Sequence, residues 1–216
     1  MIESSHKEFL DALLVGNRSK CSEIVGNLFN KNIPVPIEDI YESVIKKTLY
    51  VIGEMWESGK ISVATEHLAS AIVEAILNEL YIKVISTKRI NKTAVVACVE
   101  QEYHQVGIKM VADVFEINGW NAFFLGANTP ANELVKFITE IQPDVVALSL
   151  SIYANLLNLE IMLEAIRKEF PTLIIIVGGQ AFRHGGREVL IKYQNVIYLA
   201  DLYGVESFLK SSILSH

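Results

Sequence analysis

The residues with the clearest capacity for chemistry are Glu102 and His104, which follow an apolar, β-branched run at 93–99. In open α/β sheets, ligands bind beyond the carboxyl ends of the strands, so a loop in this place is a candidate site. A histidine there can bind a metal through one ring nitrogen while a carboxylate holds the other nitrogen. Gly107 follows where the chain is expected to enter a helix. We therefore interpret residues 102–107 as the loop that supplies the metal ligand of a binding site.

The elements that must position this loop are predicted to form an α/β domain. After residue 92, short apolar segments alternate with helical patterns, and the segment 172–177 is almost wholly apolar, as in parallel strands covered on both faces. This alternation predicts a flavodoxin-like (Rossmann-like), doubly wound, five-stranded parallel sheet with its site above the first and third strands. The expected strands are 93–99, 120–125, 144–149, 172–177 and 196–200. The expected helices are 106–118, 130–141, 154–169, 181–192 and 203–213, with Thr129 as an N-cap and Pro130 in the first turn.

The first part of the chain is expected to be a small four-helix bundle whose helices are joined by short connections. Helices are predicted at 4–15, 19–30 and 37–56, and a fourth runs from the N-cap Ser62 to about Ile85. Pro34-Val35-Pro36 separates the second helix from the third, because prolines are excluded from helix interiors. A polar linker at 86–92 then divides a helical domain, 1–86, from an α/β domain, 87–216.

Composition narrows the possible functions. The 216-residue chain has a formal net charge of −6 and no cluster of Lys or Arg, which argues against a broad nucleic-acid-binding surface. Its two cysteines cannot form a disulfide framework, which fits a reducing cytoplasm. No segment has the length of a membrane span, and no signal peptide is recognised.

The residues at the ends of the other strands exclude two common classes of protein with this fold. Ser149 stands where a phospho-accepting receiver would need an aspartate, and no glycine-rich turn for a dinucleotide follows the first strand. The third strand end offers Ser149, Ser151 and Tyr153, and the fourth offers Gly178, Gly179 and Gln180. The small residues among these leave space for a long, slender group inserted at the edge of the sheet.

These residues resemble a known family. Residues 102–107, Glu-Tyr-His-Gln-Val-Gly, are similar to the cobalamin-binding signature Asp/Glu-x-His-x-x-Gly. Ser149-Leu150-Ser151 and Gly178-Gly179 are similar to the serine and glycine motifs that accompany it. The resemblance implies that His104 replaces the cofactor's own dimethylbenzimidazole base on cobalt. It also implies that the nucleotide tail lies beside the serine and the glycines. The signature further places Glu102, Tyr103, Gln105, Val106 and Gly107 at the cofactor.

The helical part carries a second resemblance. Trp56, followed ten residues later by Glu66-His67, is similar to the cap of cobalamin-dependent photoreceptor repressors. The resemblance implies that these three residues face the upper side of the corrin, where Trp56 would shield a cobalt–carbon bond. Two features depart from that family: Glu57 stands where the photoreceptors carry a histidine, and no DNA-binding domain is recognised. A self-contained light-operated repressor is therefore not expected.

Simpler interpretations stay open for individual residues. His104 could be a structural histidine, Trp56 a core anchor of a helix hairpin, and Gly178-Gly179 a tight turn.

Three functions remain at this point. The first is a cobalamin-dependent sensor or regulatory module read by a protein partner. The second is a corrinoid methyl carrier of a methyltransferase system, which a bulky Trp56 over the cobalt disfavours. The third is a cobalamin storage or delivery protein. No catalytic residues are identified, and a homo-oligomer is possible.

Overall fold

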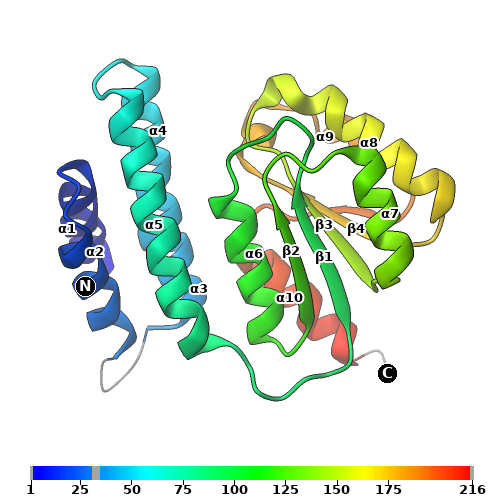
Figure 1. The fold of residues 1–216 in the computed structure, drawn as a ribbon, viewed down its shortest axis with the longest axis horizontal. Coiled ribbons are helices and arrows are strands. Elements are labelled where there is room, and N and C mark those ends of the chain that lie inside the picture. Colours follow the sequence, from blue (N-terminus) through cyan, green and yellow to red (C-terminus); the bar gives the residue numbers. More distant parts are fainter. Residues whose placement is uncertain (1, 31–34, 215–216) are drawn as a thin grey trace. The chain divides into compact units, whose positions relative to one another are not determined.

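The computed structural model describes residues 2–30 and 35–214, which belong to two compact units, Met1–Val84 and Ile85–His216 (Figure 1). The first unit is helical, and the second is an α/β unit built on a single sheet. No helix within the described residues is both long and apolar enough to cross a membrane.

Within residues 2–30 and 35–84, the helical unit has four helical segments. The elements are α1 (Ile2–Leu14), α2 (Arg18–Phe29), α3 (Ile37–Ile40), a π-helical stretch (Tyr41–Lys46), α4 (Lys47–Glu57) and α5 (Val63–Val84). The third segment was expected as one regular helix at 37–56, but the stretch Tyr41–Lys46 is wound more widely. Ser62 is an N-cap as predicted, since its Oγ accepts a hydrogen bond from Thr65 N. Pro36 precedes α3, whereas Pro34 lies outside the described residues.

The sheet of the α/β unit has the predicted flavodoxin-like topology. Its strands are β1 (Thr93–Cys98), β2 (Asn121–Gly126), β3 (Val145–Ser149), β4 (Ile174–Gly178) and β5 (Val196–Tyr198). All neighbouring pairs are parallel, in the order β2-β1-β3-β4-β5. The carboxyl ends of β1 and β3 are therefore adjacent, and the loops that follow them meet at one edge of the sheet.

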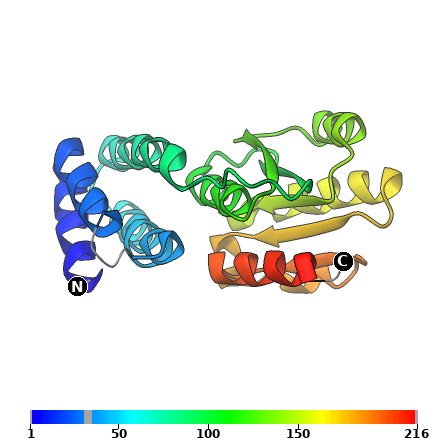
Figure 2. The ribbon, with the colours of Figure 1, turned by 90° about the horizontal axis from the view of Figure 1, so that it is seen from below.

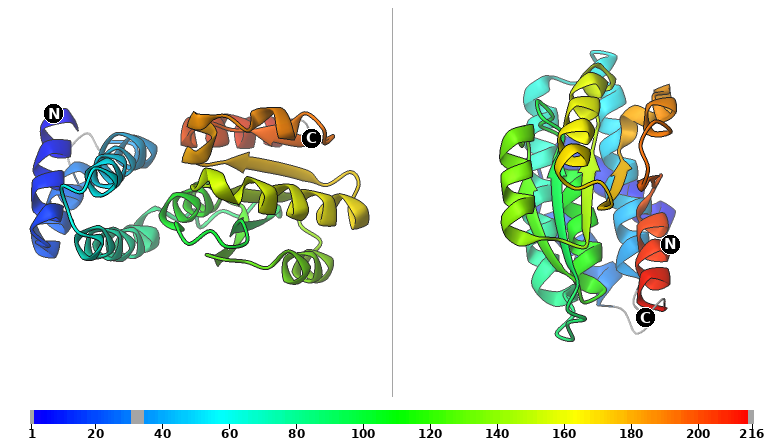
Figure 3. Two further views of the ribbon diagram at one scale, coloured as in Figure 1. Left: turned by 90° about the horizontal axis from the view of Figure 1, so that it is seen from above. Right: turned by 90° about the vertical axis from the view of Figure 1, so that its right-hand side faces the viewer.

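Helices cover the sheet on both faces. The helices of this unit are α6 (Val106–Ile117), α7 (Ala131–Ile141), α8 (Leu156–Glu169), α9 (Arg187–Leu190) and α10 (Leu202–Leu214), with short 3₁₀ turns at Tyr153–Asn155 and Gln180–His184. Figures 2 and 3 show α7 and α8 on one face and α6 and α10 on the other. Leu134, Leu159 and Leu163 of α7 and α8 pack on Val146 and Val177 of the sheet. This continuous apolar core holds the strand ends in place.

Two helix predictions in the α/β unit were wrong in part. The helix expected at 181–192 is a 3₁₀ turn followed by the short α9, because Gly185 (φ 119°) and Gly186 (φ 86°) have left-handed backbones that end a helix. Pro130 is the N-cap of α7 rather than its first residue, with an extended ψ of 139°.

The linker at 86–92 is packed against α6. Ile90 N donates a hydrogen bond to Gly119 O (3.0 Å), and Arg89 forms an ion pair with the nearly buried Glu116 at the end of α6. Gly119 has φ 83°, and a Cβ there would lie 2.5 Å from Lys88 O, so this turn requires glycine. The linker thus forms part of the α/β unit.

Candidate functional site

The loop after β1 carries Glu102 and His104. Glu102 N donates to Val99 O (2.9 Å), which turns the chain back at the strand end, and Asn128 N donates to Glu102 O (2.8 Å). The chain enters α6 at Val106, with Gln105 as N-cap residue. His104 therefore lies on a short, hydrogen-bonded loop between a strand and a helix.

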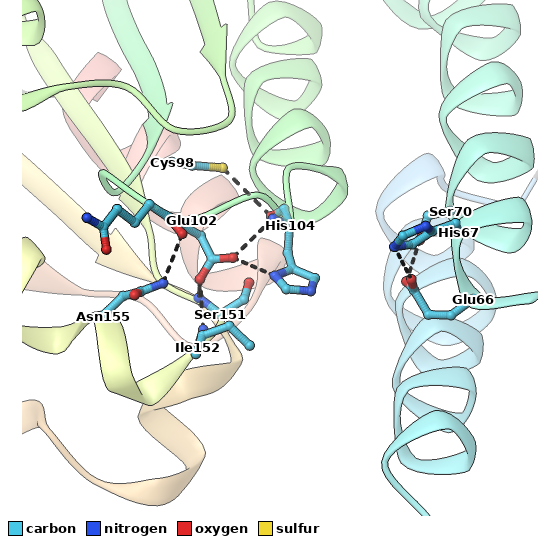
Figure 4. A network of polar contacts seen from close by, with 10 residues as sticks. Glu66, His67, Ser70, Cys98, Glu102, His104, Ser151, Ile152 and Asn155 are labelled. Atoms are coloured by element: carbon cyan, nitrogen blue, oxygen red, sulfur yellow. Dashed lines mark hydrogen bonds and ion pairs between the residues drawn. The ribbon is translucent and has the colours of Figure 1, made fainter. Parts of the chain in front are cut away.

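The Glu102 carboxylate is the centre of this loop. The residue is fully buried, and its Oε1 accepts hydrogen bonds from His104 Nδ1 (2.5 Å) and from His104 N (3.0 Å). Its Oε2 accepts from Ser151 N (2.9 Å) and Ile152 N (2.8 Å), which belong to the loop after β3. Figure 4 shows the two carboxylate oxygens turned toward these two sides. One buried carboxylate thus joins the loops that follow β1 and β3.

These hydrogen bonds control the charge of Glu102. Burial alone would raise the pKa of its carboxyl, but the hydrogen bonds from the side chain and N–H of His104, from Ile152 N and from Ser151 N outweigh burial and lower the pKa to about 2. The carboxylate is therefore ionised at neutral pH. The neighbouring Cys98 thiol has its pKa raised to about 12, by burial and by the charge of Glu102, so it stays protonated.

The carboxylate also fixes the orientation of the His104 ring. An ionised Glu102 can only accept, so Nδ1 of a neutral His104 carries the proton and Nε2 carries the lone pair. The side chain of His104 is 48% exposed, so the ring reaches the surface at the edge of the sheet. A carboxylate-held imidazole of this kind is a good ligand for a transition metal.

The other strand ends lie in register with this loop. Cys98, Ser149 and Gly178 are paired side by side across β1, β3 and β4, and Ser149 is buried. A Cβ on Gly178 would lie 2.8 Å from Leu199 O. A Cβ on Gly179, which has φ 115°, would lie 2.1 Å from Leu150 O. The fold itself therefore requires the glycine pair, so the pair alone does not indicate a ligand pocket.

Gly107 differs from these glycines. A Cβ placed on it would meet no protein atom within 4 Å, although it stands in the first turn of α6. The α/β unit has no need of a glycine here, and alanine would be the better helix former. Gly107 is exposed and lies three residues after His104, and an open position there would allow a flat ligand to approach α6 closely.

The remaining candidates at this edge differ in exposure. The exposed ones are Tyr103 (68%) and Tyr153 (45%). Val106 is buried, and Gln180 begins the 3₁₀ turn after Gly179. Gln105 Oε1 accepts a hydrogen bond from Ala127 N (3.2 Å) in the loop after β2.

In the helical unit, Glu66 and His67 lie next to each other at the start of α5. Glu66 Oε1 accepts from Ser70 Oγ (2.8 Å), and Oε2 lies 3.7 Å from Nε2 of the largely exposed His67 (Figure 4). Trp56, near the end of α4, is 42% exposed. A tryptophan this exposed is not a core anchor of the unit.

Glu100, which follows β1 in the sequence, bonds to another element: its Oε2 accepts from Ala131 N (3.1 Å) at the start of α7. Sequence reasoning missed two asparagines that hold the loop after β1. Asn128 Oδ1 accepts from Gln101 N (2.9 Å), and Asn155 Nδ2 donates to Gln101 O (3.2 Å). Their signal in the sequence is weak, because an asparagine in a loop has many possible partners.

Comparison with known protein families decides between the possible ligands. A model described as a B12 binding domain matches residues 92–208, and a second model of the same description matches residues 6–81. This chain belongs to the B12-binding family. Cobalamin is accordingly the cofactor of this B12-binding protein, and both of its units lie in matched regions.

Two relatives from different functional classes resemble the B12-binding protein in sequence. The HTH-type transcriptional repressor CarH of Myxococcus xanthus is 32% identical over 145 residues, covering 66% of this chain and 48% of CarH. The chain thus spans about half the length of CarH. Trimethylamine corrinoid protein 1 of Methanosarcina mazei is 27% identical over 173 residues, covering 78% of this chain and 76% of that protein.

Among solved structures, the Methanosarcina barkeri monomethylamine corrinoid protein matches with a TM-score of 0.83 and 13% identity. The match covers 100% of both chains. At this identity the likeness shows the fold alone, and it confirms the helical cap followed by the five-stranded parallel α/β domain.

Proposed function

We propose that the protein binds cobalamin in the base-off form, with Nε2 of His104 as the lower cobalt ligand, and acts as a cobalamin-dependent sensor or regulatory module. The hydrogen bond between His104 Nδ1 and the buried, ionised Glu102 supports the ligand assignment most directly. It keeps the lone pair on Nε2 and strengthens the imidazole as a donor. When bound, the corrin would supply the cobalt centre that His104 would hold.

The other residues of the site are assigned by the same proposal. Gly107 leaves room for the corrin beside α6, and Tyr103, Gln105 and Val106 complete the loop. Ser149, Ser151, Tyr153, Gly178, Gly179 and Gln180 border the nucleotide tail. Trp56, Glu66 and His67 of a helical cap at 1–86 face the upper ligand of cobalamin held by the domain at 87–216.

The lower-ligand assignment is tested with the full chain loaded with hydroxocobalamin, reduced to cob(II)alamin and examined by electron paramagnetic resonance. An axial nitrogen splits the cobalt lines into triplets, and labelling the histidines with nitrogen-15 converts these to doublets. Doublets in the wild type that vanish in His104→Ala support ligation by His104. Triplets that persist with labelled histidine would show that the cofactor's own base stays on cobalt, contradicting the proposal.

The sensor role rests on the Trp56, Glu66 and His67 pattern, supported by the exposure of Trp56 and by the similarity to a repressor. We expect Trp56→Ala to lose the protein's preference for adenosylcobalamin over hydroxocobalamin, measured by retention after gel filtration. Ile82→Ala, which alters a 79% exposed residue of α5 outside the pattern, is the matched control. Equal retention of both cofactors by the wild type would contradict a sensor of the upper ligand.

A corrinoid methyl carrier is the second candidate. It is favoured by the trimethylamine corrinoid protein, which matches over three quarters of both chains. In either role the protein would work with a protein partner, and self-association is possible. Methylation of the reduced, protein-bound cobalt by a partner methyltransferase, followed by turnover of the methyl group, would decide for the carrier.

A further inference from the structure

The backbone of Gln101, the residue before Glu102, is held from two sides by asparagine side chains. On one side, Asn128 in the loop after β2 accepts a hydrogen bond from Gln101 N at 2.9 Å. On the other side, Asn155 in the 3₁₀ turn after β3 donates to Gln101 O at 3.2 Å. Both backbone groups of one residue are thus bound by side chains from different loops.

The backbone conformation of this residue explains why it needs support. Gln101 has φ 65° and Asn128 has φ 49°, both in the left-handed region that residues other than glycine rarely occupy. Asparagine tolerates this region better than other residues with a side chain, but glutamine does not share that tolerance. Gln101 is also exposed, so neighbouring packing does little to hold it. The hydrogen bonds at its N–H and C=O therefore maintain the turn.

The same turn determines where Glu102 points. Asn128 makes a second contact, from its own N–H to Glu102 O (2.8 Å), so one residue binds both Gln101 and Glu102. The Glu102 carboxylate in turn orients the His104 ring. A small rotation of the Gln101–Glu102 peptide would move the carboxylate away from His104 Nδ1 or from the N–H groups after β3.

We infer that Asn128 and Asn155 are positioning residues that set the strength of the His104–cobalt bond through Gln101 and Glu102. This inference rests on the proposed ligation by His104. The side chains of both asparagines bond to Gln101, so their effect on His104 passes through Gln101 and Glu102. Each links the His104 loop to a different neighbour, the loop after β2 or the loop after β3.

The test compares the ratio of histidine-on to histidine-off cob(II)alamin, read from the nitrogen splitting in paramagnetic resonance spectra of histidine-labelled protein. Asn128→Gly keeps the left-handed backbone but removes the Oδ1 acceptor, and Asn155→Ala removes the Nδ2 donor. We expect either change to lower the ratio several-fold and the double variant to lower it by about tenfold. Asn128→Asp, which keeps an acceptor oxygen, is expected to restore the ratio.

Asn195→Ala is the matched control. Asn195 also has a left-handed backbone (φ 56°) and bonds across two loops, from Nδ2 to Thr172 O (3.3 Å), but it precedes β5 at the opposite edge of the sheet. It should lower stability without changing the ratio. An unchanged ratio in the double variant, while His104→Ala abolishes the doublets, would overturn this inference and leave the lower-ligand proposal intact. An equal change in Asn195→Ala would also overturn it, and doublets that survive in His104→Ala would overturn both.

Discussion

His104 Nδ1 lies 2.5 Å from Oε1 of Glu102, while the second oxygen of the same carboxylate accepts two backbone N–H groups from the loop after β3. Glu102 therefore has a structural task and a chemical one. It closes the edge of the sheet between β1 and β3, and it fixes which nitrogen of His104 is presented. Because one carboxylate performs both tasks, a substitution of Glu102 should affect both.

Glu102→Gln is expected to impair both tasks. The glutamine amide has one acceptor oxygen, so its NH₂ group must face donors either at His104 or at Ser151 and Ile152. We expect the apo protein to lose roughly 2 kcal/mol of unfolding free energy in urea titrations, since hydrogen bonds to a buried charge are being lost. Cobalamin affinity should fall about 10–100-fold.

Glu100→Gln is the control for this substitution. Glu100 lies two residues earlier and uses one oxygen to accept from Ala131 N (3.1 Å), which a glutamine can replace. Its effect should stay below about 1 kcal/mol, with unchanged cofactor retention. Similar losses of unfolding free energy and of cofactor in both variants would contradict the roles assigned to the Glu102 carboxylate.

Acid should destabilise the apo protein through Glu102. In the folded state the pKa of this carboxyl is about 2, below its ordinary value of 4.5. Between these two pH values the folded state therefore binds fewer protons than the unfolded state. The stabilisation is complete above about pH 4.5 and is lost as the pH falls toward 2. Urea titrations across this window should therefore show the wild type and Glu102→Gln converging as the pH decreases. A constant difference would contradict the pKa assignment.

The helical unit should respond to pH in a higher range, through His6. Burial lowers the pKa of His6 below 6.5, with a further lowering by Lys47 and an opposing effect of Glu3, and its Nε2 is buried without a hydrogen-bond partner. The unfolded state thus takes up the proton first, and the unit loses stability as the pH falls below about 6.5.

Tryptophan fluorescence can follow this unit separately. The chain has two tryptophans, and Trp120→Phe leaves Trp56 in α4 as the reporter. The urea midpoint of this protein should fall between pH 7.5 and pH 5.5. The decrease should be absent when His6→Phe is added, because the ring is kept but the titrating group is removed. A decrease of equal size in both proteins would exclude His6 as its source.

Gly107 and Gly179 are expected to respond in opposite ways to alanine. Gly107→Ala should leave the apo protein unchanged or stabilise it by up to about 1 kcal/mol, because the Cβ meets nothing and alanine favours the helix. If a corrin approaches α6 closely, the same methyl group will weaken cobalamin binding. Gly179→Ala should destabilise the apo protein by roughly 1–3 kcal/mol, since its φ is 115° and Leu150 O blocks the Cβ. Calorimetry without cofactor and titration with hydroxocobalamin separate the two effects.

The sequence by itself determined the architecture and the main ligand candidate. Alternating apolar runs and helical patterns predicted the five strands, since strands covered on both faces must be apolar along their length. The spacing of Glu102, His104 and Gly107 after β1 identified the candidate loop. The sequence could place this loop because ligands of open α/β sheets bind beyond the carboxyl ends of the strands.

Only the tertiary structure decided how that loop is held. Backbone N–H groups, such as those of Ser151 and Ile152, leave no trace in the sequence, because every residue but proline carries one. The roles of Asn128 and Asn155 depend on loops that are 27 and 54 residues away from Gln101 along the chain. The structure also divided the glycines by function: Gly179 is required by a carbonyl that folding brings close, whereas Gly107 faces open space. Contacts between distant segments depend on packing geometry, which no local pattern encodes.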